Sequence, residues 1–185
     1  MTSIPDFDNW QTTSWQHLNE IIDFDWILAG GFALDLFADR NWRPHDDIDI
    51  IIKRQDQAKL LQSFQLDRLF VVLEPGTLSP MSPARFYQAP IQDIWVLNAD
   101  LQSWMLQVML VDVEDGHWVY KRNTKIRLLF DEIYFEKHGI KVLKPEIQLL
   151  YKSTSHRKKD DLDRSMITPL LSDKARQWLE MNLAM

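Results

Sequence analysis

Asp47 and Asp49 open an otherwise apolar segment in which Ile48, Ile50 and Ile52 alternate with them. In a β-strand, side chains two positions apart point to the same face, so the two carboxylates would converge while the isoleucines face a core. Carboxylates held this close repel each other unless a cation lies between them. Oxygen ligands suit Mg²⁺, which binds one or two carboxylates together with water and phosphate oxygens. The spacing therefore predicts a magnesium site at Asp47 and Asp49.

Gly30 and Gly31 form a second feature with chemical meaning. They end the short apolar run 26–29 and precede residues 32–38, whose many apolar side chains predict a mostly buried helix. Adjacent glycines let the backbone approach a bulky anion, because no side chain stands in the way. The N–H groups at a helix start also favour phosphate. The order strand, glycine pair, helix, loop and Asp-x-Asp strand thus predicts a site for a metal and phosphate groups.

The segments that must position these residues predict an α+β fold. Apolar and β-branched runs predict strands over residues 26–29, 48–52, 68–73, 94–97, 105–111, 118–121, 133–137 and 140–143. Apolar residues at helical spacing predict helices over 11–23, 32–38, 55–64, 145–152, 159–171 and 172–183, the last capped by Ser172. Asp115-Gly116 and His138-Gly139 predict hairpin turns, and the proline-rich stretch 74–90 predicts a long irregular loop that could act as a lid.

The composition is that of an ordinary globular protein. Of the 185 residues, 45% are hydrophobic and 26% are charged, which suits one domain with a short helical extension. No apolar run approaches the ~20 residues of a membrane-spanning helix, and we expect no secretion signal at the start of the sequence. Cysteine is absent, which excludes disulfides, zinc–thiolate sites and cysteine nucleophiles and indicates a cytoplasmic protein.

The charge distribution favours a small anionic ligand over a nucleic acid. The net charge is −6, the opposite of what a general nucleic-acid binder carries. Within this acidic chain a basic cluster occupies eight positions and comprises Lys152, His156, Arg157, Lys158 and Lys159. The alternative interpretation of the cluster is the solvated start of a helix.

The stretch 30–50, GGFALDLFADRNWRPHDDIDI, resembles the nucleotidyltransferase superfamily that includes the DNA polymerase beta type, and it is similar in particular to aminoglycoside nucleotidyltransferases. A looser similarity extends through WVYKR (118–122), KPEIQLLYK (144–152) and RKKDDLDR (157–164). The resemblance implies a catalytic domain over residues 1–144, with a mixed sheet flanked by helices, and a C-terminal helical segment over residues 145–185 packed on it.

The reaction that this resemblance implies is magnesium-dependent nucleotidyl transfer. A hydroxyl attacks the α-phosphorus of a nucleoside triphosphate, here expected to be ATP, and pyrophosphate leaves. By motif match, Asp47 and Asp49 would bind Mg²⁺, and Gly30 and Gly31 would contact the triphosphate.

The resemblance also implies that basic side chains complete the nucleotide site; the candidates are Arg43, His45, Lys152 and Lys159. The first two lie just before the carboxylates and could reach phosphate, although a surface loop is the competing interpretation. The two lysines would neutralise the β- and γ-phosphates. Asp160 and Asp163 share a helix face and would orient these cations.

The third carboxylate of such sites, which serves as metal ligand and general base, has no obvious counterpart. Gln107 aligns where relatives often have aspartate. Asp112 lies on the same predicted strand, in a register matching Val108 and Leu110, and is the candidate base and third metal ligand, with Glu114 as the alternative. Both could instead be polar residues at a strand end.

Three functions remain open on these grounds. The first is transfer of a nucleoside monophosphate to a hydroxyl of a small acceptor, such as an aminoglycoside. The second is a protein-modifying nucleotidyltransferase of a toxin–antitoxin pair. The third is a nucleotide-binding regulatory protein without catalysis, which Gln107 favours. A metal phosphohydrolase is disfavoured, because His45-Asp46 has no second histidine pair at suitable spacing.

Overall fold

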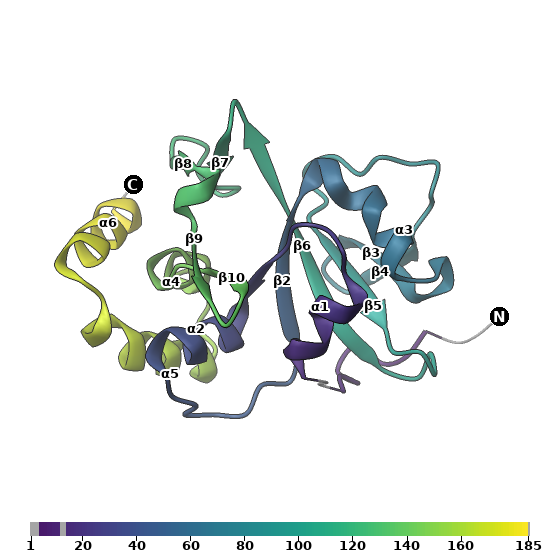
Figure 1. The fold of residues 1–185 in the computed structure, drawn as a ribbon, viewed down its shortest axis with the longest axis horizontal. Helices are drawn as coiled ribbons and strands as arrows, with labels where there is room; N and C mark the ends of the chain where they lie inside the picture. The colour runs from purple at the N-terminus through teal and green to yellow at the C-terminus, as the bar shows by residue number, and fades with distance from the viewer. Residues whose placement is uncertain (1–3, 12–13, 185) are drawn as a thin grey trace. The chain divides into compact units, whose positions relative to one another are not determined.

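A computed structural model of the chain describes residues 4–11 and 14–184, and its ribbon is drawn in Figure 1. The chain forms two compact units. Unit 1 comprises Met1–Trp26 and His45–Asp112, and unit 2 comprises Ile27–Pro44 and Val113–Met185. The chain therefore leaves unit 1 after Trp26, contributes the glycine pair to unit 2, and returns at His45.

Unit 1 contains a sheet of strand order β4-β3-β5-β6-β2. The strands are β2 (Ile48–Lys53), β3 (Leu69–Glu74), β4 (Thr77–Pro80), β5 (Asp93–Leu97) and β6 (Trp104–Glu114), whose last two residues belong to unit 2. β2 runs parallel to β6, whereas the other neighbouring pairs are antiparallel. The predicted strands over 48–52, 68–73, 94–97 and 105–111 are all present.

One face of this sheet carries an apolar core, because side chains alternate along each strand. The residues of this core are at most 2% exposed and include Ile48, Ile50, Ile52, Ile94, Val96, Leu106, Val108 and Leu110. The other face mixes buried apolar residues with half-buried polar ones, among them Asp49 and Gln107. We call this second face the polar face of unit 1.

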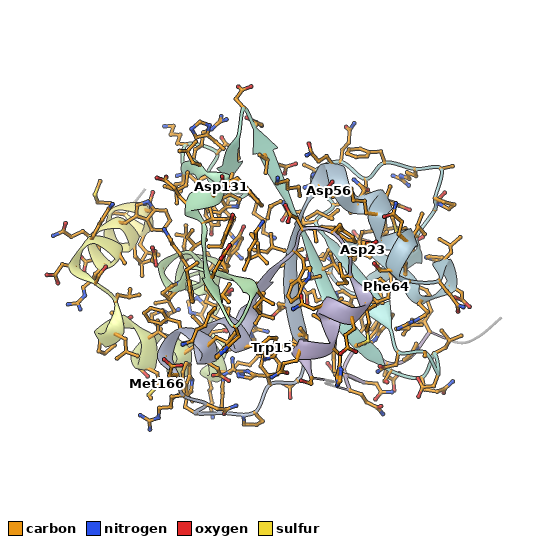
Figure 2. The ribbon with its side chains drawn as sticks, viewed as in Figure 1. Trp15, Asp23, Asp56, Phe64, Asp131 and Met166 are labelled. Atoms are coloured by element: carbon orange, nitrogen blue, oxygen red, sulfur yellow. The ribbon has the colours of Figure 1, made fainter. Side chains whose placement is uncertain are left out.

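The helical segments of unit 1 are short: η1 (Trp15–His17), α1 (Leu18–Ile21), η2 (Arg54–Lys59), α3 (Leu60–Ser63) and η3 (Leu66–Arg68). Figure 2 labels Asp56 in η2 and Phe64 directly after α3; the Phe64 side chain is buried. The helix predicted over 11–23 forms only over 15–21 of the described residues, and Thr12 and Thr13 lie outside them.

The stretch 74–90, expected to be irregular, contains strand β4, and its later part is anchored. Arg54 Nη1 donates to the carbonyl oxygens of Tyr87 (3.2 Å) and Ile91 (2.5 Å). Gln57 accepts from the Tyr87 N–H at 2.8 Å and donates to the Tyr87 carbonyl at 3.2 Å. These contacts from η2 hold the loop against unit 1, so a lid-like motion would have to break them.

Unit 2 contains β1 (Ile27–Ala29), parallel to β10 (Ile140–Leu143), which pairs antiparallel with β9 (Tyr134–Lys137). A hairpin of β7 (His117–Val119) and β8 (Arg127–Leu129) follows the end of β6. The turns at Asp115-Gly116 and His138-Gly139 have positive φ at both residues, as two-residue hairpin turns require. Both turn predictions are confirmed, whereas β8 had not been predicted.

The longer helices of unit 2 are α2 (Gly30–Ala38), α4 (Pro145–Lys152), α5 (Lys158–Ile167) and α6 (Asp173–Leu183), with short η4 (Phe130–Glu132) and η5 (Thr168–Leu170). α4 packs against α2, α5 and α6. Pro145 lies at the first turn of α4, where its missing N–H costs nothing. Ser172 caps α6 as predicted, accepting from the Ala175 N–H at 3.2 Å.

The α+β fold class is confirmed. The helices of 145–185 belong to unit 2 together with residues 27–44 and 113–144, so no boundary between the units falls at residue 144. None of the helices formed by the described residues is long and apolar enough to cross a membrane.

Candidate active site

Asp49 lies on the polar face of unit 1, and Asp47 immediately precedes β2. Both are half-buried, while Ile48 and Ile50 between and after them are fully buried. Alternation along the strand therefore directs the carboxylates away from the apolar core, as the sequence predicts. His45 is half-buried two residues before Asp47, in the loop that leads into β2.

Gln107 is the residue of β6 directly level with Asp49 in the parallel pairing of β2 and β6. On its other side, β5 places Trp95 opposite Gln107 and Asp93 opposite Met109. The Gln107 Nε2 amide donates to Asp93 Oδ1 at 3.2 Å. The polar face thus carries Asp49, Gln107 and Asp93 on three neighbouring strands, a set that sequence reasoning did not bring together.

Asp112 lies five residues beyond Gln107 on β6, so alternation assigns it to the opposite face from Gln107 and Asp49. It forms a bidentate ion pair with Arg54: Arg54 Nε donates to Asp112 Oδ1 at 2.5 Å, and Arg54 Nη2 donates to Asp112 Oδ2 at 3.0 Å. Glu114, in unit 2, pairs with Arg127 at 3.1 Å. The structure thus gives both candidate bases a cationic partner, and gives Asp112 a place across the sheet from Asp49.

Gly30 begins α2 with φ of 66°, a left-handed conformation that a side chain makes costly. Its N–H donates to Gln148 Oε1 of α4 at 2.7 Å. Gln148 is buried and lies 118 positions away, so no local pattern could identify it. Gly31 follows in the first turn of α2. The positive φ of Gly30 therefore gives the pair a structural role in the turn between β1 and α2.

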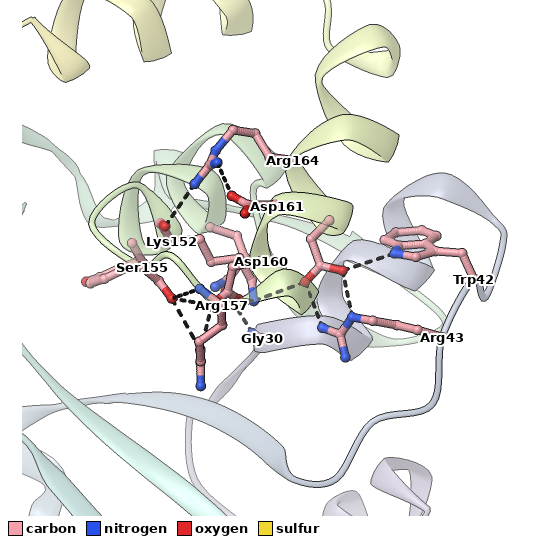
Figure 3. Close-up of polar contacts among 12 residues, drawn as sticks. Gly30, Trp42, Arg43, Lys152, Ser155, Arg157, Asp160, Asp161 and Arg164 are labelled. Carbon is pink, nitrogen blue, oxygen red and sulfur yellow. Dashed lines mark hydrogen bonds and ion pairs between the residues drawn. The ribbon is translucent and has the colours of Figure 1, made fainter.

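Lys152 ends α4 and is only 8% exposed. Its Nζ contacts Asp160 Oδ1 at 2.5 Å and Asp163 Oδ2 at 3.0 Å, both on α5. Asp160 also accepts from Ser155 and Arg157 (Figure 3). Burial raises the pKa of Asp160, but hydrogen bonds from Lys152, Ser155 and Arg157 outweigh it and hold that pKa well below its usual range. The expectation that these aspartates orient Lys152 is met in geometry.

Arg43 binds Asp163, the second aspartate that contacts Lys152. Its Nε and Nη2 donate to Asp163 Oδ1 and Oδ2 at 2.8 and 2.7 Å, and Trp42 Nε1 donates to Oδ1 at 3.0 Å (Figure 3). The bond to Asp163 raises the pKa of Arg43. Burial raises the pKa of Asp163, yet the bonds from Arg43 and Lys152 lower it overall. We call Arg43, Lys152, Arg157, Asp160 and Asp163 together the basic cluster of unit 2; it is a spatial group and differs from the run of basic residues over 152–159 in the sequence.

Lys159 is half-buried in the first turn of α5, next to this basic cluster in sequence. The predicted nucleotide-binding residues are therefore divided between the units: Gly30, Gly31, Arg43, Lys152 and Lys159 belong to unit 2, whereas His45, Asp47 and Asp49 belong to unit 1.

Mg²⁺ fits Asp47 and Asp49 by the chemistry of the donors, since it takes only one or two carboxylates and completes its shell with water and substrate phosphates. Within residues 4–11 and 14–184, no group of three or more histidine, cysteine, aspartate or glutamate side chains is arranged to hold a metal ion. A magnesium ion at Asp47 and Asp49 would therefore complete its shell with water or with phosphate oxygens of the substrate.

Solved structures with this fold include two antibiotic-modifying enzymes. The lincosamide antibiotic adenylyltransferase LnuA, lincomycin-bound, aligns with a TM-score of 0.57 and 17% identity over 87% of this chain and 100% of its own. ANT(2'')-Ia in complex with adenylyl-2''-tobramycin aligns with a TM-score of 0.58 and 12% identity over 93% of this chain and 98% of its own. At these identities the similarity establishes the fold.

No curated protein sequence matches the chain. The model of the aminoglycoside 2''-adenylyltransferase family, in contrast, matches residues 16–167. That range contains the glycine pair, the Asp-x-Asp strand and the basic cluster of unit 2. The chain therefore belongs to the aminoglycoside 2''-adenylyltransferase family and is a nucleotidyltransferase.

Proposed function

We propose that the protein transfers a nucleoside monophosphate from a nucleoside triphosphate, ATP, to a hydroxyl of a small antibiotic acceptor of the aminoglycoside type. The observation that carries this proposal is the placement of Asp49 on the polar face of β2, with Asp47 just before it and an isoleucine core behind. Family membership supplies the reaction class. The relatives that contain lincomycin or adenylyl-2''-tobramycin support an antibiotic as acceptor.

Asp47 and Asp49 would hold Mg²⁺, which when bound supplies positive charge to the phosphates. The basic cluster of unit 2 supports a role for unit 2 in supplying positive charge to the phosphates. Arg43, Lys152 and Arg157 contact the carboxylates of Asp160 and Asp163, so guanidinium and ammonium groups suited to phosphate are gathered at one place in unit 2. Because these side chains already bond one another, they are oriented before a phosphate arrives.

Calorimetry with each nucleoside triphosphate and Mg²⁺, followed by pyrophosphate release with a panel of aminoglycosides and a lincosamide, tests the proposal. We expect tight binding of one triphosphate, and mass spectrometry should find an acceptor heavier by one nucleoside monophosphate. Asp49→Asn should abolish both signals in a folded protein. Modification of a protein side chain in place of every drug would overturn the acceptor class.

The competing function is nucleotide binding without catalysis, and Gln107 is the observation in its favour. The residue level with Asp49 on the neighbouring strand carries an amide, which cannot accept a proton as a carboxylate does. Nucleotide binding by wild type with no pyrophosphate release for any acceptor would support this function over the enzyme.

A further inference from the structure

The polar face of unit 1 carries a carboxylate in addition to the Asp-x-Asp pair. Asp93 lies on β5, which neighbours β6, and β6 neighbours β2. Neighbouring strands lie about 4.8 Å apart, so Asp93 and Asp49 flank Gln107 from its two sides. Asp93 is half-buried at the start of β5.

Gln107 has a defined orientation in this row. Its Nε2 donates to Asp93 Oδ1 at 3.2 Å, and an amide that donates to one carboxylate fixes the direction in which that carboxylate points. The bond holds the Asp93 carboxylate beside the Gln107 amide, on the face that also carries Asp49. Gln107 itself has no group that can take a proton at neutral pH.

We propose that Asp93 is the general base of the nucleotidyl transfer, with Gln107 as the residue that positions it. The inference rests on the proposed function. In the step, the acceptor hydroxyl oxygen forms a bond to the α-phosphorus, the bond from that phosphorus to the bridging α–β oxygen breaks, and pyrophosphate leaves with the electron pair. The hydroxyl proton goes to the Asp93 carboxylate and from there to solvent.

Asp112, the other carboxylate of unit 1 considered for this role, is less suited to it. It lies on the face of β6 opposite to Asp49, and both of its oxygens bond the buried Arg54 guanidinium. A base must lie within hydrogen-bond reach of the hydroxyl that it deprotonates. A hydroxyl that attacks a phosphate held at Asp49 must lie on the polar face, where Asp93 and Gln107 are.

The experiment compares Asp93→Asn with wild type and with Asp67→Asn, the same chemical change at an exposed position of η3. MgATP affinity is measured by calorimetry and turnover by pyrophosphate release with the acceptor found for wild type. We expect Asp93→Asn to keep MgATP affinity within about threefold and to lower kcat by about 10²–10⁴, the usual effect of losing positioned proton transfer. Asp67→Asn should leave both unchanged.

A rescue separates catalysis from structure. Adding Gln107→Asp to Asp93→Asn puts a carboxylate level with Asp49, and we expect it to recover at least about tenfold of the lost kcat. Gln107→Ala alone should lower kcat with little change in KM. Thermal unfolding checks that each variant is folded; if Asp93→Asn is not, Asp93→Ser replaces it.

The remaining outcomes overturn the inference. Turnover of Asp93→Asn within threefold of wild type would leave the proposed function standing and remove the base. Loss of MgATP binding together with turnover would assign Asp93 to the nucleotide site. Wild type that binds MgATP and modifies no acceptor would remove both the inference and the proposed function.

Discussion

The basic cluster of unit 2 and the polar face of unit 1 hold their charges in different ways. In the cluster, the carboxylates of Asp160 and Asp163 have no exposed side-chain surface, and each bonds several donors. On the polar face, Asp49 and Asp93 are half-buried around a neutral amide. The carboxylates of the cluster are thus enclosed by their donors, whereas those of the polar face are half-buried, on a face to which alternation along β2 also assigns Lys53. We infer that the cluster contributes to the stability of unit 2 and that the polar face is organised to bind a ligand.

Replacing the Asp-x-Asp pair should have the largest effect on nucleotide-dependent turnover. We expect Asp47→Asn and Asp49→Asn each to weaken Mg²⁺-dependent nucleotide binding by more than about 10²-fold, since loss of a mere supporting residue around a metal commonly costs 10–100-fold. Calorimetry with and without Mg²⁺ measures the affinity, and thermal unfolding measures the stability.

Wild-type affinity in either variant would show that the metal site lies elsewhere. The distinction between a ligand-binding polar face in unit 1 and a structural cluster in unit 2 would then fail, because the polar face would bind no cation.

Bulk at the glycine pair should have the next largest effect. Gly31→Val should lower nucleotide affinity by about tenfold or more, because a side chain there would obstruct the approach of phosphate to the backbone. Gly30→Ala is the comparison for backbone strain: at φ of 66° a side chain costs roughly 1–2 kcal/mol of folding free energy. Urea unfolding and nucleotide titration separate the two effects, and unchanged affinity in folded Gly31→Val would make the pair purely structural.

The basic cluster should respond in stability more than in turnover. Asp163→Ala leaves the buried Lys152 and the half-buried Arg43 with one carboxylate fewer, and breaking a buried pair typically costs about 3–5 kcal/mol. The folded-state pKa of Asp163 is below its ordinary value of 3.8, so the carboxylate stabilises the fold above that value and loses this contribution as the pH falls further. The fall in unfolding free energy below about pH 4 should therefore be shallower in the variant.

A matched control for this prediction is Asp161→Ala, an exposed aspartate on the same helix that pairs with Arg164. Surface pairs of this kind contribute at most about 1 kcal/mol. Equal destabilisation by the two changes would contradict the distinction between a buried cluster and a solvated helix face.

How far the sequence predicts these two regions depends on how local the interactions are. The order β1, glycine pair, α2, loop and β2 follows from neighbouring residues and was predicted, as were both hairpin turns. Periodicity failed where elements are short: β4 and β8 have few residues, and η2 replaces most of a predicted α-helix.

The partners of the site residues could not be predicted, because they are distant in the chain. Gly30 bonds Gln148, Arg43 bonds Asp163, and Gln107 of β6 bonds Asp93 of the neighbouring strand β5. Each side chain alone looks like an ordinary polar residue. Only the strand register shows that Gln107 is level with Asp49 and that Asp112 lies on the other face.

Asp112 should show the smallest effect on turnover, and it tests the comparison most directly. If the ion pair with Arg54 is structural, Asp112→Asn should leave kcat within about threefold of wild type and lower the unfolding free energy by about 1.5–3 kcal/mol, the usual contribution of a hydrogen bond to a charged group. Arg54 would keep its bonds to the Tyr87 and Ile91 carbonyls, which limits the loss. Glu114→Gln, at a 60% exposed carboxylate paired with Arg127, should change stability by less than about 1 kcal/mol. If Asp112 is instead the base that the sequence suggests, Asp112→Asn would lower kcat by about 10²–10⁴ with nucleotide binding intact. That result would move the chemistry across the sheet and contradict the assignment to Asp93, because a single hydroxyl cannot reach carboxylates on both faces.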